Sequence, residues 1–83
     1  MAKEPELRTP KHEALRLFLK VERTRVEISQ IELARRLGWT QRTISDIETG
    51  DKRVTVLELL ALSTVLGFDP CLAIRHLEGI KDE

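Results

Sequence analysis

The sequence predicts an all-α fold, a compact bundle of five short helices. Apolar residues recur at three- and four-residue spacing between residues that cap helices, and no segment shows the alternating pattern of a strand. The chain has 83 residues, of which 41% are hydrophobic, enough for a single core and too few for a second one. We therefore expect one domain over residues 9–80, preceded by a flexible polar arm over residues 1–8 and followed by a tail over residues 81–83.

The first helix is expected over about residues 10–24. Thr9 can cap its N-terminus, and Pro10 suits the first helical position because the nitrogen there needs no hydrogen bond. Glu22 and the arginines of this helix are expected to point outward. The residues expected on its inner face are Leu15, Phe18 and Leu19.

The second helix is expected over about residues 30–37. Ser29 and Glu32 have the spacing of a capping box, in which each side chain accepts a hydrogen bond from the other residue's backbone N–H. Gly38 can adopt the left-handed conformation that ends a helix. The apolar stripe consists of Leu33, Ala34 and Leu37.

The third helix is expected over about residues 41–49, after a short turn. Thr40 supplies its N-cap and Gly50 its end. Ile44 and Ile47 are spaced to face inward. Because neither the second nor the third helix reaches three full turns, both must pack against neighbours to be stable.

Two further helices are expected over about residues 56–66 and 70–78. Thr55 and Glu58 form a capping box at the start of the fourth helix, and the pair Asp69-Pro70 starts the fifth. The residues expected to be buried in the fourth helix are Val56, Leu59, Leu60, Ser63 and Leu66.

Two runs of residues stand out between Ser29 and Gly50: Ser29-Gln30-x-Glu32-Leu33-Ala34-x-x-Leu37-Gly38 and Thr40-Gln41-x-x-Ile44-Ser45-x-Ile47-Glu48-x-Gly50. With these residues, the segment closely resembles the lambda-repressor/Cro (XRE) family of DNA-binding domains. The resemblance extends from about Leu15 to Leu77 and implies a lambda-repressor-like helix-turn-helix fold. Family members commonly place glycine at the position of Glu27, so the connection before the second helix is expected to be longer or differently wound.

The resemblance also implies a partly buried ion pair between Arg23 and Glu48, which match a family position pair. Glu48 would lie beside the C-terminus of the third helix, where the macrodipole disfavours a carboxylate unless a cation compensates it. Removing either partner should therefore leave the other charge without a counter-ion.

The resemblance implies that the third helix enters the major groove of double-stranded DNA and presents its first side chains to base edges. Gln41 can bond adenine through two atoms, and Arg42 can do the same with guanine. Asp46 either accepts a hydrogen bond from cytosine or holds the Arg42 guanidinium; we favour the second role because phosphates repel an uncompensated carboxylate. The expected base contacts are Thr40, Gln41, Arg42 and Asp46.

Contacts to DNA phosphates are expected at several positions around that helix. Gln30 would meet one phosphate at the start of the second helix, and the family uses glutamine here to bridge a phosphate and the recognition helix. Lys52 and Arg53 would bind the strand further along, while Thr43 and Ser45 reach a phosphate or a thymine methyl group.

Lysine plus arginine and aspartate plus glutamate each number 14, so the formal net charge is zero. Nonspecific attraction to DNA should therefore be modest, and specific binding should depend on base contacts and dimer geometry. The last two helices carry more apolar residues than a monomer core needs, which predicts a homodimer, although the fifth helix can instead cover the monomer core. The residues expected at the dimer interface are Leu57, Ala61, Leu72, Ile74 and Leu77.

Metal, cofactor and enzyme sites are not expected. The single Cys71 cannot form an internal disulfide, and His12 and His76 are too far apart in sequence to make a zinc-binding pattern with it. Both histidines are expected to be solvated, and the sequence has no glycine-rich phosphate loop or recognisable nucleophile. No segment has the apolar length of a signal peptide or membrane span, and a reduced, cytoplasmic setting is expected.

Two classes of function fit these residues. The first is a sequence-specific transcriptional regulator, a dimeric repressor of a palindromic operator; a phage-type repressor, an antitoxin and a restriction-modification controller would look alike. The second is a protein-interaction module of the same fold, which binds a partner such as a toxin through the last two helices. The expected DNA contacts favour the first class, the zero net charge and Asp46 favour the second, and we give the first more weight.

Overall fold

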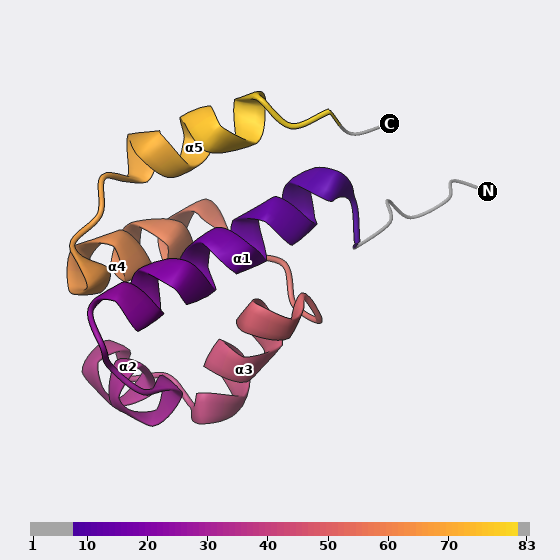
Figure 1. Ribbon diagram of the computed structural model, residues 1–83. Coiled ribbons are helices and arrows are strands. Elements are labelled where there is room, and N and C mark those ends of the chain that lie inside the picture. The colour runs from indigo at the N-terminus through magenta and orange to yellow at the C-terminus, as the bar shows by residue number, and fades with distance from the viewer. Residues whose placement is uncertain (1–7, 82–83) are drawn as a thin grey trace.

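A computed structural model describes residues 8–81 of the chain (Figure 1). The predicted all-α, five-helix fold is confirmed, and none of the helices in the described part is long and apolar enough to cross a membrane. The first helix continues to Arg25, past its expected end at Thr24. The helices are α1 (Pro10–Arg25), α2 (Gln30–Leu37), α3 (Gln41–Thr49), α4 (Val56–Leu66) and α5 (Pro70–Glu78).

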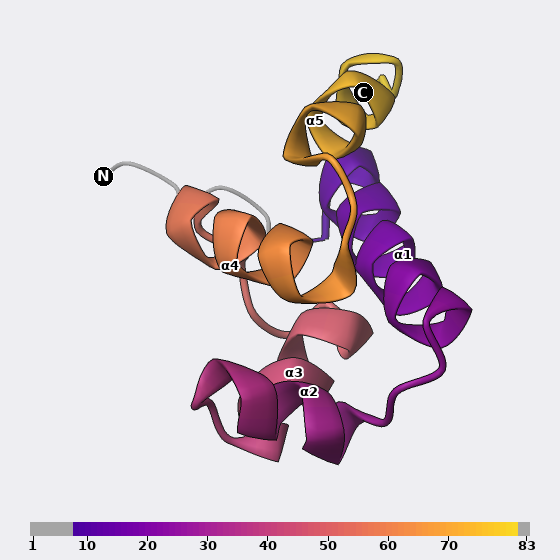
Figure 2. The same ribbon diagram turned by 90° about the vertical axis from the view of Figure 1, so that its left-hand side faces the viewer.

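The helices are arranged in layers, which Figures 1 and 2 show from two sides. α1 and α4 occupy the middle, α2 and α3 pack together on one side of them, and α5 lies on the opposite side. α1 contacts α3, α4 and α5, while α2 contacts both α3 and α4. This arrangement leaves the first residues of α3 exposed at the end of the molecule that is farthest from α5.

A single apolar core joins the five helices in the described part of the chain. Each leucine or isoleucine in it stabilises the fold by roughly 1.5–3 kcal/mol relative to exposure in water. The core residues are Leu19, Leu33, Ala34, Ile44, Ile47, Leu59, Leu62, Leu66 and Ala73.

The expectation that Val56 and Leu60 are buried is wrong, since their exposed fractions are 71% and 45%. Leu62, which that expectation omitted, is 1% exposed. Apolar residues occupy every side of α4, so their spacing alone does not define which side faces the core. Contacts with α1, α2 and α5 decide it. The buried residues of α4 are Leu59, Leu62, Ser63 and Leu66.

Side chains cap the starts of the helices. At α2, Ser29 accepts a hydrogen bond from the Glu32 backbone, but the Glu32 carboxylate does not complete the expected capping box. It binds Arg35 and Arg36 instead, and these bonds lower the pKa of Glu32 from 4.5 to about 2. At α4, both halves of the capping box of Thr55 are present.

The connection from α1 to α2 contains a residue with unusual backbone geometry. Glu27 has a φ of 59°, the left-handed conformation that glycine adopts without strain. For a residue with a Cβ, this conformation costs roughly 1–2 kcal/mol. Arg23 Nη1 donates to the carbonyl of Ile28 at 2.7 Å, which holds the connection in place.

Part of the expected N-terminal arm and of the tail, residues 1–7 and 82–83, lies outside the described residues. Arg8, the last residue of the expected arm, binds Glu13, Asp51 and the carbonyl of Thr49. The chain is therefore attached to the domain from Arg8 onward.

Candidate nucleic-acid interface

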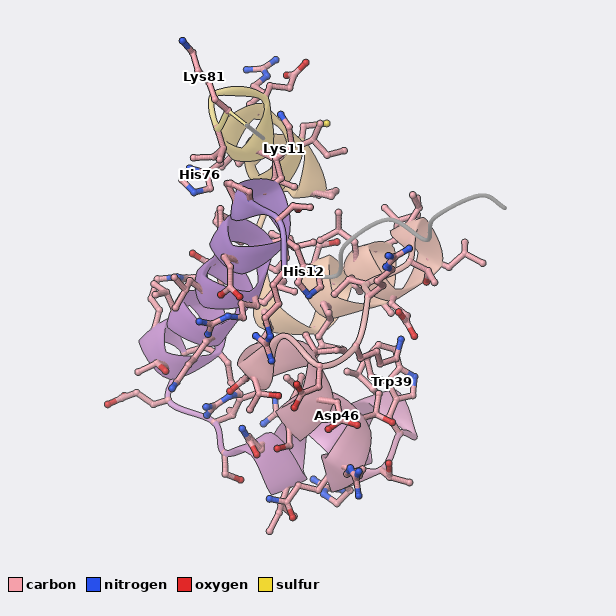
Figure 3. The ribbon with its side chains drawn as sticks, turned by 90° about the vertical axis from the view of Figure 1, so that its right-hand side faces the viewer. Lys11, His12, Trp39, Asp46, His76 and Lys81 are labelled. Carbon is pink, nitrogen blue, oxygen red and sulfur yellow. The ribbon has the colours of Figure 1, made fainter. Side chains whose placement is uncertain are left out.

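α2, the turn at Gly38 and α3 pack as one unit. Gly38 has a φ of 72°, and the backbone N–H of Trp39 donates to the carbonyl of Ala34 at 2.9 Å. Trp39 packs against the core in the same part of the molecule as α2 and α3 (Figure 3). The turn thereby holds α3 across α2, with the exposed Gln41 and Arg42 at its start.

A continuous chain of hydrogen bonds joins α1, α2 and the first turn of α3. Arg23 donates to Glu48 twice, from Nε to Oε2 at 2.6 Å and from Nη2 to Oε1 at 3.0 Å. Gln30 Nε2 donates to Glu48 Oε1 at 3.0 Å, and Gln41 Nε2 donates to Gln30 Oε1 at 3.5 Å. Gln30 therefore aligns the side chain of Gln41.

The two residues of the expected ion pair are largely withdrawn from water. The Arg23 side chain is 15% exposed and the Glu48 side chain 5%. The hydrogen bonds to Glu48 raise the pKa of Arg23, and this effect exceeds the opposing effect of burial. The expectation that all arginines of α1 point outward is therefore wrong for Arg23.

The outward face of α3 carries Arg42 and Asp46, one helical turn apart. Arg42 Nε lies 3.2 Å from Asp46 Oδ2, and 84% of the Arg42 side chain is exposed. Asp46 thus restrains the guanidinium while most of the arginine stays in solvent. Thr40 Oγ1 accepts a hydrogen bond from the backbone N–H of Thr43 at 3.2 Å, so this hydroxyl is engaged as the N-cap of α3.

The residues expected to contact phosphates differ in how they are held. Ser45 is half-buried and Arg53 is exposed. The Lys52 ammonium lies 2.7 Å and 2.8 Å from the two carboxylate oxygens of Glu58. Burial raises the pKa of Glu58, but the hydrogen bonds from Lys52 and Thr55 outweigh it, so that the pKa is lowered. Lys52 is therefore bound to the capping box of α4 and reaches a phosphate only by leaving Glu58.

The C-terminal end of α3 is bound by side chains that the sequence interpretation missed. Arg8, His12 and Arg16 contact carbonyl oxygens at that end at 2.9 Å, 3.0 Å and 3.1 Å respectively. The expectations that His12 is solvated and that Arg16 points outward are therefore wrong. No local pattern marks these contacts, because the acceptors lie 32 to 41 residues further along the chain.

Apolar side chains are exposed on α4 and α5. Of the residues expected at a dimer interface, Leu57, Leu72 and Ile74 have exposed fractions of 78%, 56% and 49%. Ala61 and Leu77 are half-buried. The expected interface omitted two exposed neighbours on α4, and we call the complete exposed set the α4 face: Val56, Leu57 and Leu60.

Comparison with known proteins identifies relatives with this arrangement of helices. Residues 19–72 match the family model described as helix-turn-helix. An XRE-family like protein from Pseudomonas syringae pv. tomato is 34% identical, with a TM-score of 0.76 over 82% of this chain and 83% of that chain. The clp gene regulator ClgR from Corynebacterium glutamicum is 26% identical, with a TM-score of 0.74 over 92% of this chain and 94% of that chain. Among curated proteins, none matches the chain.

Proposed function

Because the chain belongs to the XRE family of helix-turn-helix proteins, we propose that it is a transcriptional repressor that binds a palindromic operator as a homodimer. Membership of the family makes it a DNA-binding protein rather than an enzyme. One of its solved relatives is named as a gene regulator. We assign α3 to the major groove and the α4 face to the contact between two copies.

The observation that carries this proposal is the start of α3, where Gln41 and Arg42 are both exposed on the first turn of a helix. A helix in the major groove offers such side chains to base edges. Glutamine can bond N6 and N7 of adenine, and arginine O6 and N7 of guanine, each worth about 1–3 kcal/mol of discrimination. Gln30 and Asp46 restrain these two side chains before DNA arrives. Thr40 and Asp46 complete the base-facing set that we propose.

Contacts to phosphates would come from residues around α3. We propose Gln30, Thr43 and Ser45 near its start, and Arg53 in the loop after it. Lys52 would join them after exchanging its carboxylate partner on α4 for a phosphate. Because the net charge of the chain is zero, the salt-dependent attraction shared by all DNA sequences should be weak. Discrimination would then depend mainly on the base contacts.

A homodimer would bury the α4 face together with exposed residues of α5. Leu57 is the most exposed large apolar residue of α4, and Leu72 is the most exposed one of α5. A two-fold interface uses the same patch on both copies, so one apolar face is sufficient to form it. The two recognition helices would then occupy half-sites about one DNA turn, roughly 34 Å, apart.

The same apolar surface favours a second candidate function, the binding of a protein partner such as a toxin by α4 and α5. Charge on the outward face of α3 favours it as well, because Asp46 partly neutralises Arg42. A protein of this kind would keep the helix-turn-helix fold without reading a DNA sequence strongly.

Selection from a randomised duplex library tests the proposal. The purified full chain selects sites over several rounds, and the Kd for the enriched sequence is then followed against salt concentration. An enriched palindrome that the chain binds far more tightly than random duplex supports the repressor. Its Kd should rise with salt only as far as the two cationic phosphate contacts of each copy require. Similar weak binding to all duplexes overturns it and favours the protein-binding alternative.

Gln41→Ala and Arg42→Ala, made singly, test the assignment of α3. Each should weaken binding to the selected site about tenfold or more, the loss expected for one two-point base contact. The melting temperature should change by no more than about two degrees, because both side chains are exposed. Lys20→Ala, exposed on α1, is the matched control and should leave binding unchanged. A large fall in melting temperature would show that Gln41 and Arg42 are packing residues.

A further inference from the structure

The C-terminal end of α3 needs hydrogen-bond donors from outside the helix, because the last carbonyl groups of any helix have no partner within it. Backbone N–H groups of the following turn bond the carbonyls of Asp46 at 2.9 Å and Ile47 at 3.3 Å. This turn is closed by Gly50, which has a φ of 87°. The next carbonyls, those of Glu48, Thr49 and Gly50, are bound instead by side chains.

All three donors come from one side of α1 and the residues just before it. Arg16 Nη1, Arg8 Nη1 and His12 Nε2 bind these carbonyls at 3.1 Å, 2.9 Å and 3.0 Å. The four-residue spacing of His12 and Arg16 places these two donors on one side of α1, and Figure 3 shows His12 directed away from α5. Arg8 precedes the helix and reaches the same end of α3 from the residues before it. Because a carbonyl only accepts, His12 Nε2 carries a proton in this contact. We call Arg8, His12 and Arg16 the α1 clamp.

Carboxylates hold the two arginines of the α1 clamp, and these arginines lie against the backbone of the turn at Gly50. Glu13 binds both Arg16 and Arg8, and these bonds, chiefly that of Arg16, lower the pKa of Glu13. Arg8 Nη2 also lies 2.6 Å from Asp51 Oδ1. A Cβ added at Gly50 would lie 2.7 Å from Arg8 Nη1 and 2.9 Å from Arg16 Cδ. The side chains of both arginines therefore lie directly against the turn at Gly50.

We propose that the residues of the α1 clamp are positioning residues for DNA recognition, which set the tilt of α3 by binding its last carbonyls. The proposal rests on the proposed function. The bond from Gln41 to Gln30 restrains the start of α3. The clamp restrains its end, together with the pair of Arg23 and Glu48. Positive charge at a helix C-terminus is also favoured by the macrodipole. Without the clamp, the end of α3 is held only by the pair of Arg23 and Glu48 and by core packing. A small change in the tilt of α3 then follows, and two-point hydrogen bonds to bases tolerate little displacement.

Hydrogen exchange in the free full-length protein tests the clamp without DNA. In His12→Ala and Arg16→Ala, the amide of Gly50 should exchange about tenfold faster relative to the amide of Leu33 in α2. His12→Gln keeps an N–H donor at similar reach and should restore the protection. Lys20→Ala should match the wild type. An unchanged exchange ratio in both alanine variants would overturn the proposal.

Binding measurements test whether the clamp acts on recognition rather than on stability alone. His12→Ala and Arg16→Ala should raise the Kd for the selected site about tenfold, while the Kd for random duplex changes less than about twofold. His12→Gln should recover the wild-type ratio of these constants. Leu19→Val removes one buried methylene group from α1, outside the proposed DNA and dimer contacts, and controls for a general loss of stability. The positioning role is overturned if the ratio of the Kd for random duplex to the Kd for the selected site stays at the wild-type value in the clamp variants. It is overturned equally if that ratio falls as much in Leu19→Val.

The failures of the two proposals can be told apart. If the wild-type chain selects no DNA sequence, the proposed repressor function fails and the positioning role fails with it. If the wild-type chain selects an operator and the clamp variants keep its specificity, only the positioning role fails.

Discussion

Arg23→Ala removes the guanidinium that neutralises a buried carboxylate, and we expect it to destabilise the fold by about 3–5 kcal/mol. Arg23 donates two hydrogen bonds to Glu48 and one to the carbonyl of Ile28. The Glu48 side chain is only 5% exposed, so water cannot replace them without a rearrangement. Among the described residues, the remaining hydrogen bond to the carboxylate would come from Gln30.

This loss would be a large part of the total stability. A domain of 83 residues has a free energy of unfolding of roughly 4–12 kcal/mol, at about 0.05–0.15 kcal/mol per residue. Urea denaturation followed by circular dichroism measures the loss. With a slope of about 1.5 kcal/mol per molar urea, a loss of about 4 kcal/mol lowers the midpoint by about 2–3 M.

Arg25→Ala is the matched control for Arg23→Ala, on the same helix. Arg25 also binds a glutamate, at 2.8 Å, but its side chain is 52% exposed, so its removal should cost less than about 1 kcal/mol. Replacing Arg23 and Glu48 together by leucine removes both charges and should recover much of the stability. A loss of less than about 1 kcal/mol for Arg23→Ala, no larger than that of the control, would refute the reasoning.

Three further predictions test other parts of the fold. The pKa of Glu32 is about 2 because two neighbouring arginines bind it, so its stabilising effect should be complete above about pH 4.5 and disappear as the pH falls towards 2. Urea midpoints of Glu32→Gln and wild type should therefore converge at low pH, and a constant difference would contradict this. Gly38 and Gly50 both have positive φ, so alanine is strained at either position. An added Cβ has no neighbour within 4 Å at Gly38, but at Gly50 it would displace the arginines of the α1 clamp. Gly50→Ala should therefore destabilise by at least about 1 kcal/mol more than Gly38→Ala, and equal losses would argue against the close arginine contacts. Leu57→Glu should halve the sedimenting mass of a dimer, whereas Ile31→Glu, 62% exposed on α2, should not; an unchanged mass for Leu57→Glu would remove α4 from the interface.

Two contacts of the site differ in whether the local sequence could predict them. Arg42 and Asp46 are four residues apart on one helix, so the helix alone brings them together, and they lie 3.2 Å apart. The assignment of Lys52 to a phosphate had no such local support. Its ammonium binds Glu58 in the free protein, a contact that depends on how the loop folds back on α4.

The amino-acid sequence by itself determined the class of the fold and nearly every helix end. Capping side chains and left-handed glycines act on backbone groups within about four residues, so their signals are complete in short segments. For example, α4 begins after Thr55 and ends at Gly67, and the contacts of these two caps need no other helix. The resemblance to a known family added the pairing of Arg23 with Glu48, which no spacing within one helix could supply.

Only the tertiary structure decided which side of α4 is buried and what holds the end of α3. Apolar residues surround α4, so the burial of Leu62 and the exposure of Leu60 depend on where α1 and α2 pack. The donors of the α1 clamp meet carbonyl groups that lie 32 to 41 residues further along the chain, and a carbonyl carries no mark in the sequence. Such contacts depend on the relative placement of whole helices, which is determined by packing in three dimensions rather than by neighbouring residues.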